Sequence, residues 1–257
     1  MTPFHKIVFS KQADHDADFQ PVWLRWYTEV FKADTIIITP VKTPASSISS
    51  TVARYTNAGF IVRSIDLPLG WDDRVIWRIQ LDTVKEFLPQ APFLVVSADT
   101  DQLFYPPDLL TDDGWPYLFR RITVLTNGRE VLNCVAELGY TCGFVNTLND
   151  CRVRPTGHWG GGRVSRPYST ELHIWFRGFN YLLQKLTSLQ FSPSSYRGGA
   201  SHWRKLIRLL RRRGPSGLKE QYNQWTSSYT QHSNSIPQKH QDAISCLRNI
   251  LASTELK

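Results

Sequence analysis

The feature that most constrains the fold is an alternation of short apolar segments with amphipathic segments over the first hundred residues. The predicted strands lie at 6–11, 34–39, 60–68 and 92–99, and the predicted helices lie at 21–31, 49–58 and 72–88. The run DTIIIT is apolar throughout, as in strands buried on both faces, and we expect Pro40 and Pro44 to end it. This alternation predicts an α/β fold with a mostly parallel sheet flanked by helices.

The second half of the sequence is less regular. Strands are predicted at 119–126 and 140–148, a turn at Asn127-Gly128, and helices at 130–138, 172–189, 202–214 and 239–252. Residues 154–170 form a Gly- and Pro-rich loop, and long loops in compact domains are usually functional or mobile. We expect a domain at 1–190, made of halves 1–110 and 111–190, and a basic helical extension at 191–257 packed on or beside it.

The positive charge of the chain is concentrated in one segment. Residues 1–171 carry 17 Lys/Arg and 19 Asp/Glu, a net charge of −2, whereas residues 172–219 carry 10 Lys/Arg and no acidic residue. Nucleic-acid binding by the whole protein is therefore not expected. A local anionic partner for the C-terminal third is the better interpretation.

The segment HWRKLIRLLRRRG (202–214) predicts an amphipathic helix whose cations lie opposite Leu206, Ile207 and Leu210. Such a helix can lie in a membrane interface with its cations toward anionic head groups. It can equally be a surface helix whose apolar stripe packs on the domain. The sequence leaves both interpretations open.

Targeting and redox features are few. No apolar run approaches the ~18 residues of a membrane span, and the N-terminal segment turns acidic where a signal peptide needs its apolar core. The four cysteines show no CxxC spacing, which argues against a zinc ribbon and a disulfide scaffold. We expect a cytoplasmic protein, with peripheral contact at the inner face of a membrane if the basic helix meets one.

Two carboxylates follow the fourth predicted strand, in Asp99-Thr100-Asp101. Residues i and i+2 of an extended segment point the same way, so both carboxylates can converge on one divalent cation. In open α/β sheets, ligands bind outside the carboxyl ends of the strands. Mn²⁺ or Mg²⁺ held there can bridge the phosphates of a nucleotide diphosphate.

The first 110 residues, from KIVFSKQADHDADFQPVW to the segment leading into the DxD motif, resemble the family 2-like glycosyltransferases with the GT-A (Rossmann-like) fold. The family's DDxSxD-like segment is replaced here by TPVKTPASS, and the QxxRW motif of processive members is missing. The resemblance implies transfer of a sugar from a nucleotide-diphospho-sugar, with a UDP-sugar favoured. The acceptor would be a hydroxyl of a glycan or a lipid-linked glycan.

The resemblance also implies roles for individual residues. Asp99 and Asp101 would hold the metal, with Asp101 the preferred direct ligand. The remaining donor contacts, to the base, ribose and pyrophosphate, would come from Phe9, Ser10, Lys11, Asp66, Arg74, Arg78 and Thr100.

The catalytic base and the third metal ligand are expected in the second half. An inverting transferase needs a carboxylate that accepts the acceptor's proton, and Glu171 and Asp150 flank the Gly-rich loop. His158, borne on that loop, is the preferred additional metal ligand, whereas His173 is expected to be a core histidine. Other candidates are Trp159 and Trp175, which could stack on a sugar ring.

Two alternatives to a metal-dependent glycosyltransferase stay open. One is a non-catalytic module that binds an anionic surface or a carbohydrate. The other, less favoured because Gln102-Leu103 fits it poorly, is a phosphatase that uses the DxD motif.

Overall fold

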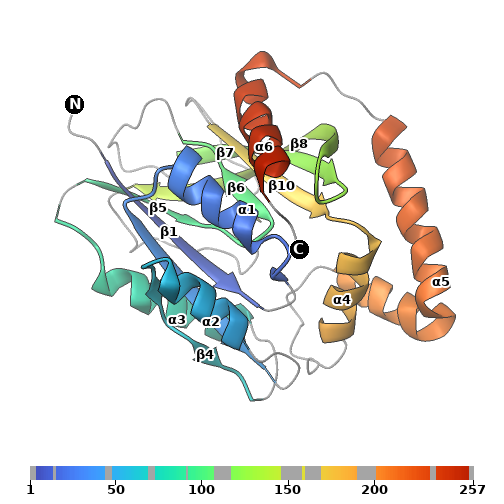
Figure 1. The fold of residues 1–257 in the computed structure, drawn as a ribbon, viewed down its shortest axis with the longest axis horizontal. Helices are drawn as coiled ribbons and strands as arrows, with labels where there is room; N and C mark the ends of the chain where they lie inside the picture. Colours follow the sequence, from blue (N-terminus) through green and yellow to red (C-terminus); the bar gives the residue numbers. More distant parts are fainter. Residues whose placement is uncertain are drawn as a thin grey trace.

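A sheet of ten strands with the order β3-β2-β1-β5-β8-β7-β10-β6 crosses the centre of the fold (Figure 1); β4 pairs with β2 and β9 with β8. The computed structural model describes residues 4–13, 16–43, 48–68, 73–90, 92–106, 117–145, 158–159, 169–189, 201–231 and 236–254. The strands are β1 (His5–Gln12), β2 (Thr35–Lys42), β3 (Ile61–Val62), β4 (Ile65–Asp66), β5 (Phe93–Ser97), β6 (Gln102–Phe104), β7 (Tyr117–Thr126), β8 (Val131–Val145), β9 (His158–Trp159) and β10 (Ser169–Phe176).

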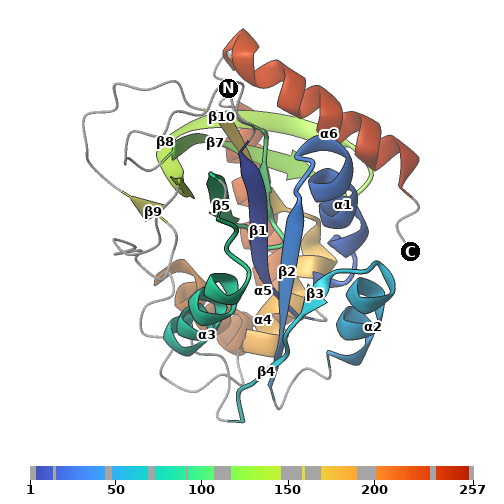
Figure 2. The same cartoon turned by 90° about the vertical axis from the view of Figure 1, so that its left-hand side faces the viewer.

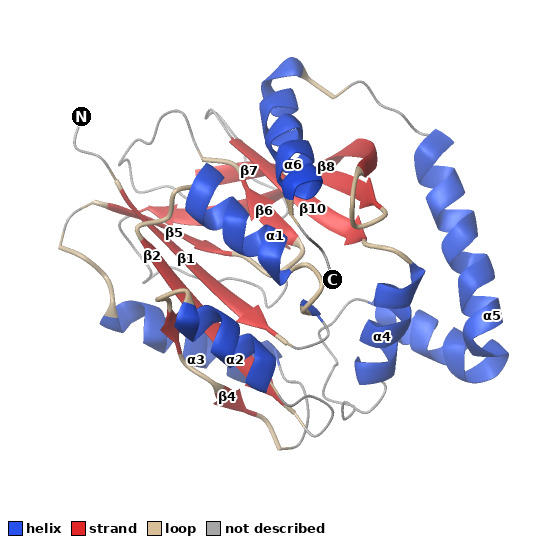
Figure 3. Ribbon diagram, in the orientation of Figure 1, coloured by secondary structure: helices blue, strands red, loops and turns tan. Residues whose placement is uncertain are grey.

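Helices pack around this sheet (Figure 3). They are α1 (Gln20–Arg25), its π-helical continuation η2 (Trp26–Val30), α2 (Ser49–Asn57), α3 (Asp73–Glu86), α4 (Phe179–Leu189), α5 (Ser201–Gln231), the short 3₁₀ turn η3 (Gln238–His240) and α6 (Gln241–Ser253). The predicted α/β class, a mostly parallel sheet flanked by helices, is confirmed.

The N-terminal half of the sheet is parallel. β1 pairs in parallel with β2 and β5, and β2 with β3 and β4. The prediction that Pro40 ends the second strand is wrong, because β2 continues to Lys42. On one edge of β2, Ile38 pairs with β3 and Val41 pairs with β4, so Pro40 lies between these two pairings. A residue without an N–H is tolerated at such an interruption.

The C-terminal half contains two corrections. Residues 130–138, predicted as a helix, belong to β8, which forms a hairpin with β7. The turn explains this, because Gly128 adopts φ +91° and brings the following segment beside β7. Residues 169–176, predicted in part as helix, form β10 between β7 and β6, and the helix begins only after Gly178, at φ +103°. A residue in that region interrupts a helix, so the chain changes here from strand to helix.

Helices cover both faces of the parallel half. Figure 2 shows α1 and α2 on one side of β1 and β2, and α3 on the other. The first face buries Val8, Ile38 and Val96 with the aromatic side chains of α1, and α6 adds Ile244 and Leu247 to the same cluster. The second face packs around Val84 of α3. The sheet is therefore buried on both faces, which accounts for its continuous apolar strands.

The C-terminal helices take different positions. α5 is two helical pieces joined at Gly214, where φ is +67°, with Pro215 beginning the second piece. Its side chains Leu206 and Leu218 pack against Leu182 and Leu186 of α4. Within the described part of the chain, no helix combines the length and the apolar character needed to cross a membrane.

Candidate functional site

Several segments that are far apart in the sequence meet at the carboxyl edge of the parallel strands. They are the end of β1, the segment beginning at Asp16, the turn after β5, the second half of β10, and the first turns of α4. Ion pairs join them: Lys11 pairs with Asp99, Asp101 with His173 and Lys185, and Asp16 with Arg177. We call these side chains, with Asp18 and Tyr181, the charged cluster. It lies where open α/β sheets bind their ligands.

The turn that carries Asp99 and Asp101 is held by backbone hydrogen bonds on both sides. The Ala98 N–H donates to the Phe9 carbonyl at 2.9 Å, and the Ile174 N–H donates to the Asp101 carbonyl at 2.7 Å. The Gln102 side chain closes the turn, because its Oε1 accepts the Asp99 N–H at 3.1 Å. The two carboxylates therefore occupy a fixed position between β1 and β10.

The π-helical turn η2 holds the strand that follows. The Tyr27 hydroxyl donates to the Gln102 carbonyl at 2.9 Å and accepts the Phe104 N–H at 3.0 Å, so it replaces a strand partner for β6. The Trp26 Nε1–H donates to the Phe104 carbonyl at 2.7 Å. π-helical turns often mark functional sites, and this one aims two buried aromatic side chains at the segment next to the DxD motif.

Asp101 faces the side chains of His173, on β10, and Lys185, on α4. Its Oδ2 lies 3.7 Å from Lys185 Nζ and 3.9 Å from His173 Nε2, and 21% of its side chain is exposed. Burial alone would raise the pKa of Asp101, but the charges of Lys185, His173 and Arg177 outweigh it and lower that pKa. Asp101 is therefore an ionised carboxylate at neutral pH with one oxygen toward a partly open space.

A hydrogen-bonded network anchors α4 to the first loop of the chain. Arg177 Nη2 donates to Asp16 Oδ1 at 2.7 Å, Tyr181 Oη donates to the same oxygen at 3.1 Å, and Lys185 Nζ donates to Tyr181 Oη at 3.0 Å. The Arg177 guanidinium also stacks 3.5 Å from the Tyr181 ring centroid. Burial would lower the pKa of Lys185, but Tyr181, Asp101 and Asp16 raise it, so its ammonium is held charged beside the DxD turn.

Of the donor residues expected from the sequence, Lys11 is close to the motif, and its Nζ lies 3.7 Å from Asp99 Oδ2. The Thr100 hydroxyl is buried and has no hydrogen-bond partner among the described residues. Ser10 is buried, and its hydroxyl accepts from Gln12 Nε2 at 3.2 Å. The Phe9 side chain lies wholly inside the core, packed near Val84, so the structure places it away from any surface that a base could reach.

Other expected donor residues lie apart from the cluster. Asp66 is at the end of β4, exposed, with an oxygen 3.7 Å from Lys42 Nζ. Arg78 is exposed on α3. Asp66 thus pairs with Lys42 on the neighbouring strand β2.

Glu171 lies in β10 and does not begin a helix. It is fully buried, and its two oxygens accept hydrogen bonds from Arg121 Nη2 at 3.0 Å and Arg121 Nε at 3.3 Å. A general base needs access to the acceptor's hydroxyl proton. In this structure the carboxylate is engaged inside the sheet.

Several expected site side chains fall outside the described part of the structure. Asp150 is one, and no side-chain position is described for Arg74 or Trp175. His158 and Trp159 are placed only by their backbones, as β9 beside Tyr140 and Thr141 of β8.

Asp99, Asp101 and His173 carry the oxygen and nitrogen donors that a divalent cation takes. No group of three His, Cys, Asp or Glu side chains is gathered for a metal within the described ranges. Asp101 and His173 nevertheless offer an oxygen and a nitrogen that face one another across 3.9 Å. Mg²⁺ is commonly held by one or two carboxylates together with substrate phosphates. The four carboxylates of the cluster also outnumber Lys11, Arg177 and Lys185, so an anionic ligand needs further positive charge.

The sequence missed five residues of this cluster: Asp16, Asp18, Arg177, Tyr181 and Lys185. For Tyr181 and Lys185 the signal was the boundary at Gly178. A helix that starts after this glycine places Tyr181 and Lys185 one turn apart on one face of its first half, directly after a strand end. His173 was expected in the core, but its ring faces Asp101 because it lies one residue after Leu172 on a paired strand whose sides alternate.

Comparisons with known proteins add little to this geometry. No family model matches the chain, and no curated protein sequence matches it. Among solved structures, a galactosyltransferase, LgtC, in complex with donor and acceptor sugar analogues aligns with 47% of this chain and 46% of its own length, at 17% identity and a TM-score of 0.25. This match therefore spans about half of the LgtC chain.

A second solved structure aligns over nearly the whole chain. It is a Bacillus anthracis protein assigned as a glucose-1-phosphate thymidylyltransferase, in complex with a sucrose, which covers 99% of this chain and 98% of its own at 8% identity and a TM-score of 0.30. Both TM-scores are low, so the class of the protein rests on its strand order and its charged cluster: an α/β protein with a carboxylate site at the carboxyl edge of its parallel strands.

Proposed function

We propose that the protein is a glycosyltransferase that moves a sugar from a nucleotide-diphospho-sugar, with UDP-sugars first, to an acceptor hydroxyl of a glycan or a lipid-linked glycan. One observation carries the proposal. The Asp99-Thr100-Asp101 turn lies at the carboxyl edge of the parallel strands, and Asp101 faces an imidazole and a charged ammonium there. That combination suits a diphosphate bound with a divalent cation.

Asp99, Asp101 and His173 are the residues that would hold Mn²⁺ or Mg²⁺. When bound, the cation supplies positive charge to the diphosphate that leaves with the nucleotide. His173 takes the role that the sequence gave to His158, because its Nε2 is the ring nitrogen that faces Asp101.

Lys185 and Lys11 are the cations of this chain that flank the carboxylates. Lys185 Nζ is oriented by its hydrogen bond to Tyr181 and kept charged by Asp101 and Asp16. We assign it a contact with the leaving diphosphate, where its charge would stabilise the developing negative charge without reorganisation. Lys11, at the end of β1, would contact the nucleotide from the opposite side of the motif.

The proton of the acceptor hydroxyl needs a carboxylate that the acceptor can reach. Glu171 is held by Arg121 inside the sheet, so we assign it a structural role in supporting β10. Asp150 then remains the candidate base if the enzyme inverts configuration at the sugar.

The test is a panel of nucleotide-sugars screened for slow hydrolysis and transfer in the presence of Mn²⁺, with wild-type protein and the Asp101→Asn variant. We expect one donor to be turned over, the activity to be lost with a chelator, and Asp101→Asn to lose it while folding normally. Asp82→Asn is the matched control, because Asp82 is an exposed aspartate on α3 paired only with Lys85 at 3.5 Å. Absence of turnover for every donor, or full activity of Asp101→Asn, would contradict the proposal.

A further inference from the structure

The first half of α5 presents cations to solvent on one side and apolar side chains to the protein on the other. Lys205, Arg208, Arg211 and Arg212 are exposed, and we call them the cationic face. At 100° per residue they occupy one continuous side of the helix over two turns. Across the helix, Leu206 is 3% exposed.

The apolar side of this helix is already in use. Leu206 packs with Leu182 and Leu186 of α4, and Ile207 and Leu210 contact the same cluster. Insertion of this side into a membrane interface, one of the two interpretations left open by the sequence, would require α5 to leave α4. Among the described side chains of 205–213, the exposed ones are all cations, so these are what this half of the helix presents to a surface.

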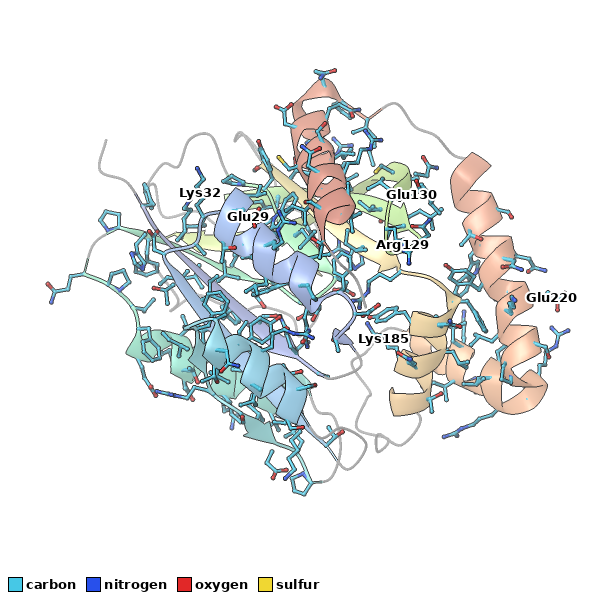
Figure 4. The ribbon with its side chains drawn as sticks, viewed as in Figure 1. Glu29, Lys32, Arg129, Glu130, Lys185 and Glu220 are labelled. Carbon is cyan, nitrogen blue, oxygen red and sulfur yellow. The ribbon has the colours of Figure 1, made fainter. Side chains whose placement is uncertain are left out.

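The charge of the surrounding sequence is not balanced. No Asp or Glu occurs between residues 172 and 219, and Glu220 lies 3.5 Å from Arg213, outside the cationic face. Figure 1 shows α4 and the beginning of α5 at the margin of the fold, beyond the end of the sheet, and Figure 4 labels Lys185 on α4 and Glu220 on the outer side of α5. The cationic face therefore belongs to a helix at the margin of the fold, within a stretch of sequence that has no acidic residue.

We propose that the cationic face of α5 is a docking surface for an anionic lipid bilayer. A bilayer fits better than a nucleic acid for two reasons. Four cations on one helix face fall in the range of roughly four to eight Lys/Arg that bind anionic lipid head groups, whereas a strongly salt-dependent DNA-binding protein makes roughly six to ten phosphate contacts. Residues 1–171 also carry a net charge of −2, so a long polyanion would gain nothing by wrapping further around the protein.

The packing of α4 places the two surfaces near each other. Tyr181 and Lys185 of α4 face the charged cluster, while Leu182 and Leu186 of the same helix face α5. α4 and α5, each about 10 Å across, thus lie between the cluster and the cationic face. If the proposed glycosyl transfer is correct, and this step rests on it, docking holds the site within roughly 20 Å of acceptors carried by lipid.

The test is co-sedimentation of the full chain with vesicles of pure phosphatidylcholine or with about one third phosphatidylserine, at about 50 mM and about 200 mM salt. We expect binding only to the anionic vesicles, weakening at the higher salt. Each cation near such a surface contributes roughly fivefold in partitioning. The triple variant Arg208→Gln, Arg211→Gln, Arg212→Gln should therefore bind about 100-fold more weakly.

A matched variant removes the same charge elsewhere. Lys85, Arg129 and Arg248 are exposed on α3, the β7–β8 turn and α6, and their replacement by Gln should leave vesicle binding within about twofold of wild type. The proposal is overturned if wild-type protein ignores anionic vesicles at low salt, or if both triple variants lose binding equally. It is also overturned if a short DNA duplex binds more tightly than the vesicles at the same salt.

The outcome is separable from that of the proposed activity. Vesicle binding by a protein that turns over no nucleotide-sugar would support the docking surface and remove the proposed glycosyl transfer. Nucleotide-sugar hydrolysis in solution by a protein that does not bind anionic vesicles would support the proposed glycosyl transfer and remove the docking surface.

Discussion

Replacing Lys185 with methionine removes one positive charge from the charged cluster and keeps most of the side chain's volume. The Lys185 ammonium lies 3.0 Å from Tyr181 Oη and 3.7 Å from Asp101 Oδ2, and its side chain is 17% exposed. The methionine can still pack along the Tyr181 ring, whose centroid lies 5.5 Å from the ammonium. We therefore expect a folded variant whose defect is mainly electrostatic.

The size of the defect follows from what the ammonium does in the proposed complex. A hydrogen bond to a charged group contributes about 1.5–3 kcal/mol, which is roughly 10- to 150-fold in a dissociation constant. We expect UDP in the presence of Mn²⁺ to bind Lys185→Met more weakly by a factor in that range. If Lys185 also stabilises charge that develops on the leaving group, kcat should fall further than donor affinity.

Isothermal titration calorimetry with UDP and Mn²⁺ measures the affinity, and donor hydrolysis measures kcat. Lys219→Met is the control, because Lys219 is an exposed lysine on α5 outside the cluster. Wild-type protein that binds UDP and a Lys185→Met variant that binds it equally well would refute the assignment of Lys185. A large loss in Lys219→Met would show that the effect is not local.

Three further predictions concern the scaffold. Tyr27→Phe removes the hydroxyl that bonds the Phe104 N–H and the Gln102 carbonyl, so both buried backbone groups lose a partner and the free energy of unfolding in urea should fall by about 2–4 kcal/mol. A change under about 0.5 kcal/mol would contradict the role of η2. Glu171→Gln breaks a buried pair with Arg121 and should cost about 3–5 kcal/mol, much of it recovered in the double variant Glu171→Leu, Arg121→Met; an unstable double variant would argue that the pair itself is required. Burial raises the pKa of Cys134 to about 11, so the unfolded chain loses this proton first as the pH rises. The unfolding free energy should then fall by about 2 kcal/mol between pH 9 and 11 in wild type relative to Cys134→Ala, and equal pH profiles would exclude the effect.

The parallel half of the fold could be predicted because its signals are local. The run DTIIIT shows no alternation of polar and apolar residues, which indicates a strand buried on both faces. Gly59, at φ +80°, lies just after α2, where a C′ glycine ends a helix. The prediction that Pro40 ends the strand was wrong. Pro40 is accommodated because the pairing of β2 is interrupted between β3 and β4, and that interruption depends on the neighbouring strands. No property of residue 40 itself indicates that interruption.

The second half could not be predicted to the same degree because its signals depend on pairing. Residues 131–138 are as compatible with a short helix as with a strand until the Gly128 turn brings them beside β7. Residues 169–176 likewise become a strand because β7 and β6 lie on either side. Short apolar runs of this kind are ambiguous by periodicity alone.

The same dependence on pairing explains which half of the site was found. Asp99 and Asp101 could be identified from their spacing within one segment, and their position follows from the strand before them. Arg177, Tyr181 and Lys185 carry no motif, and their place beside Asp101 follows only once β10 is a strand and Gly178 ends it. An error of secondary structure at one segment therefore hid Arg177 and Lys185, while Lys11 and the two carboxylates of the motif were still found. The carboxylates alone were enough to identify a candidate site. The charge balance of the site, on which the proposal of a diphosphate ligand depends, follows only when the residues after β10 are placed beside those after β5.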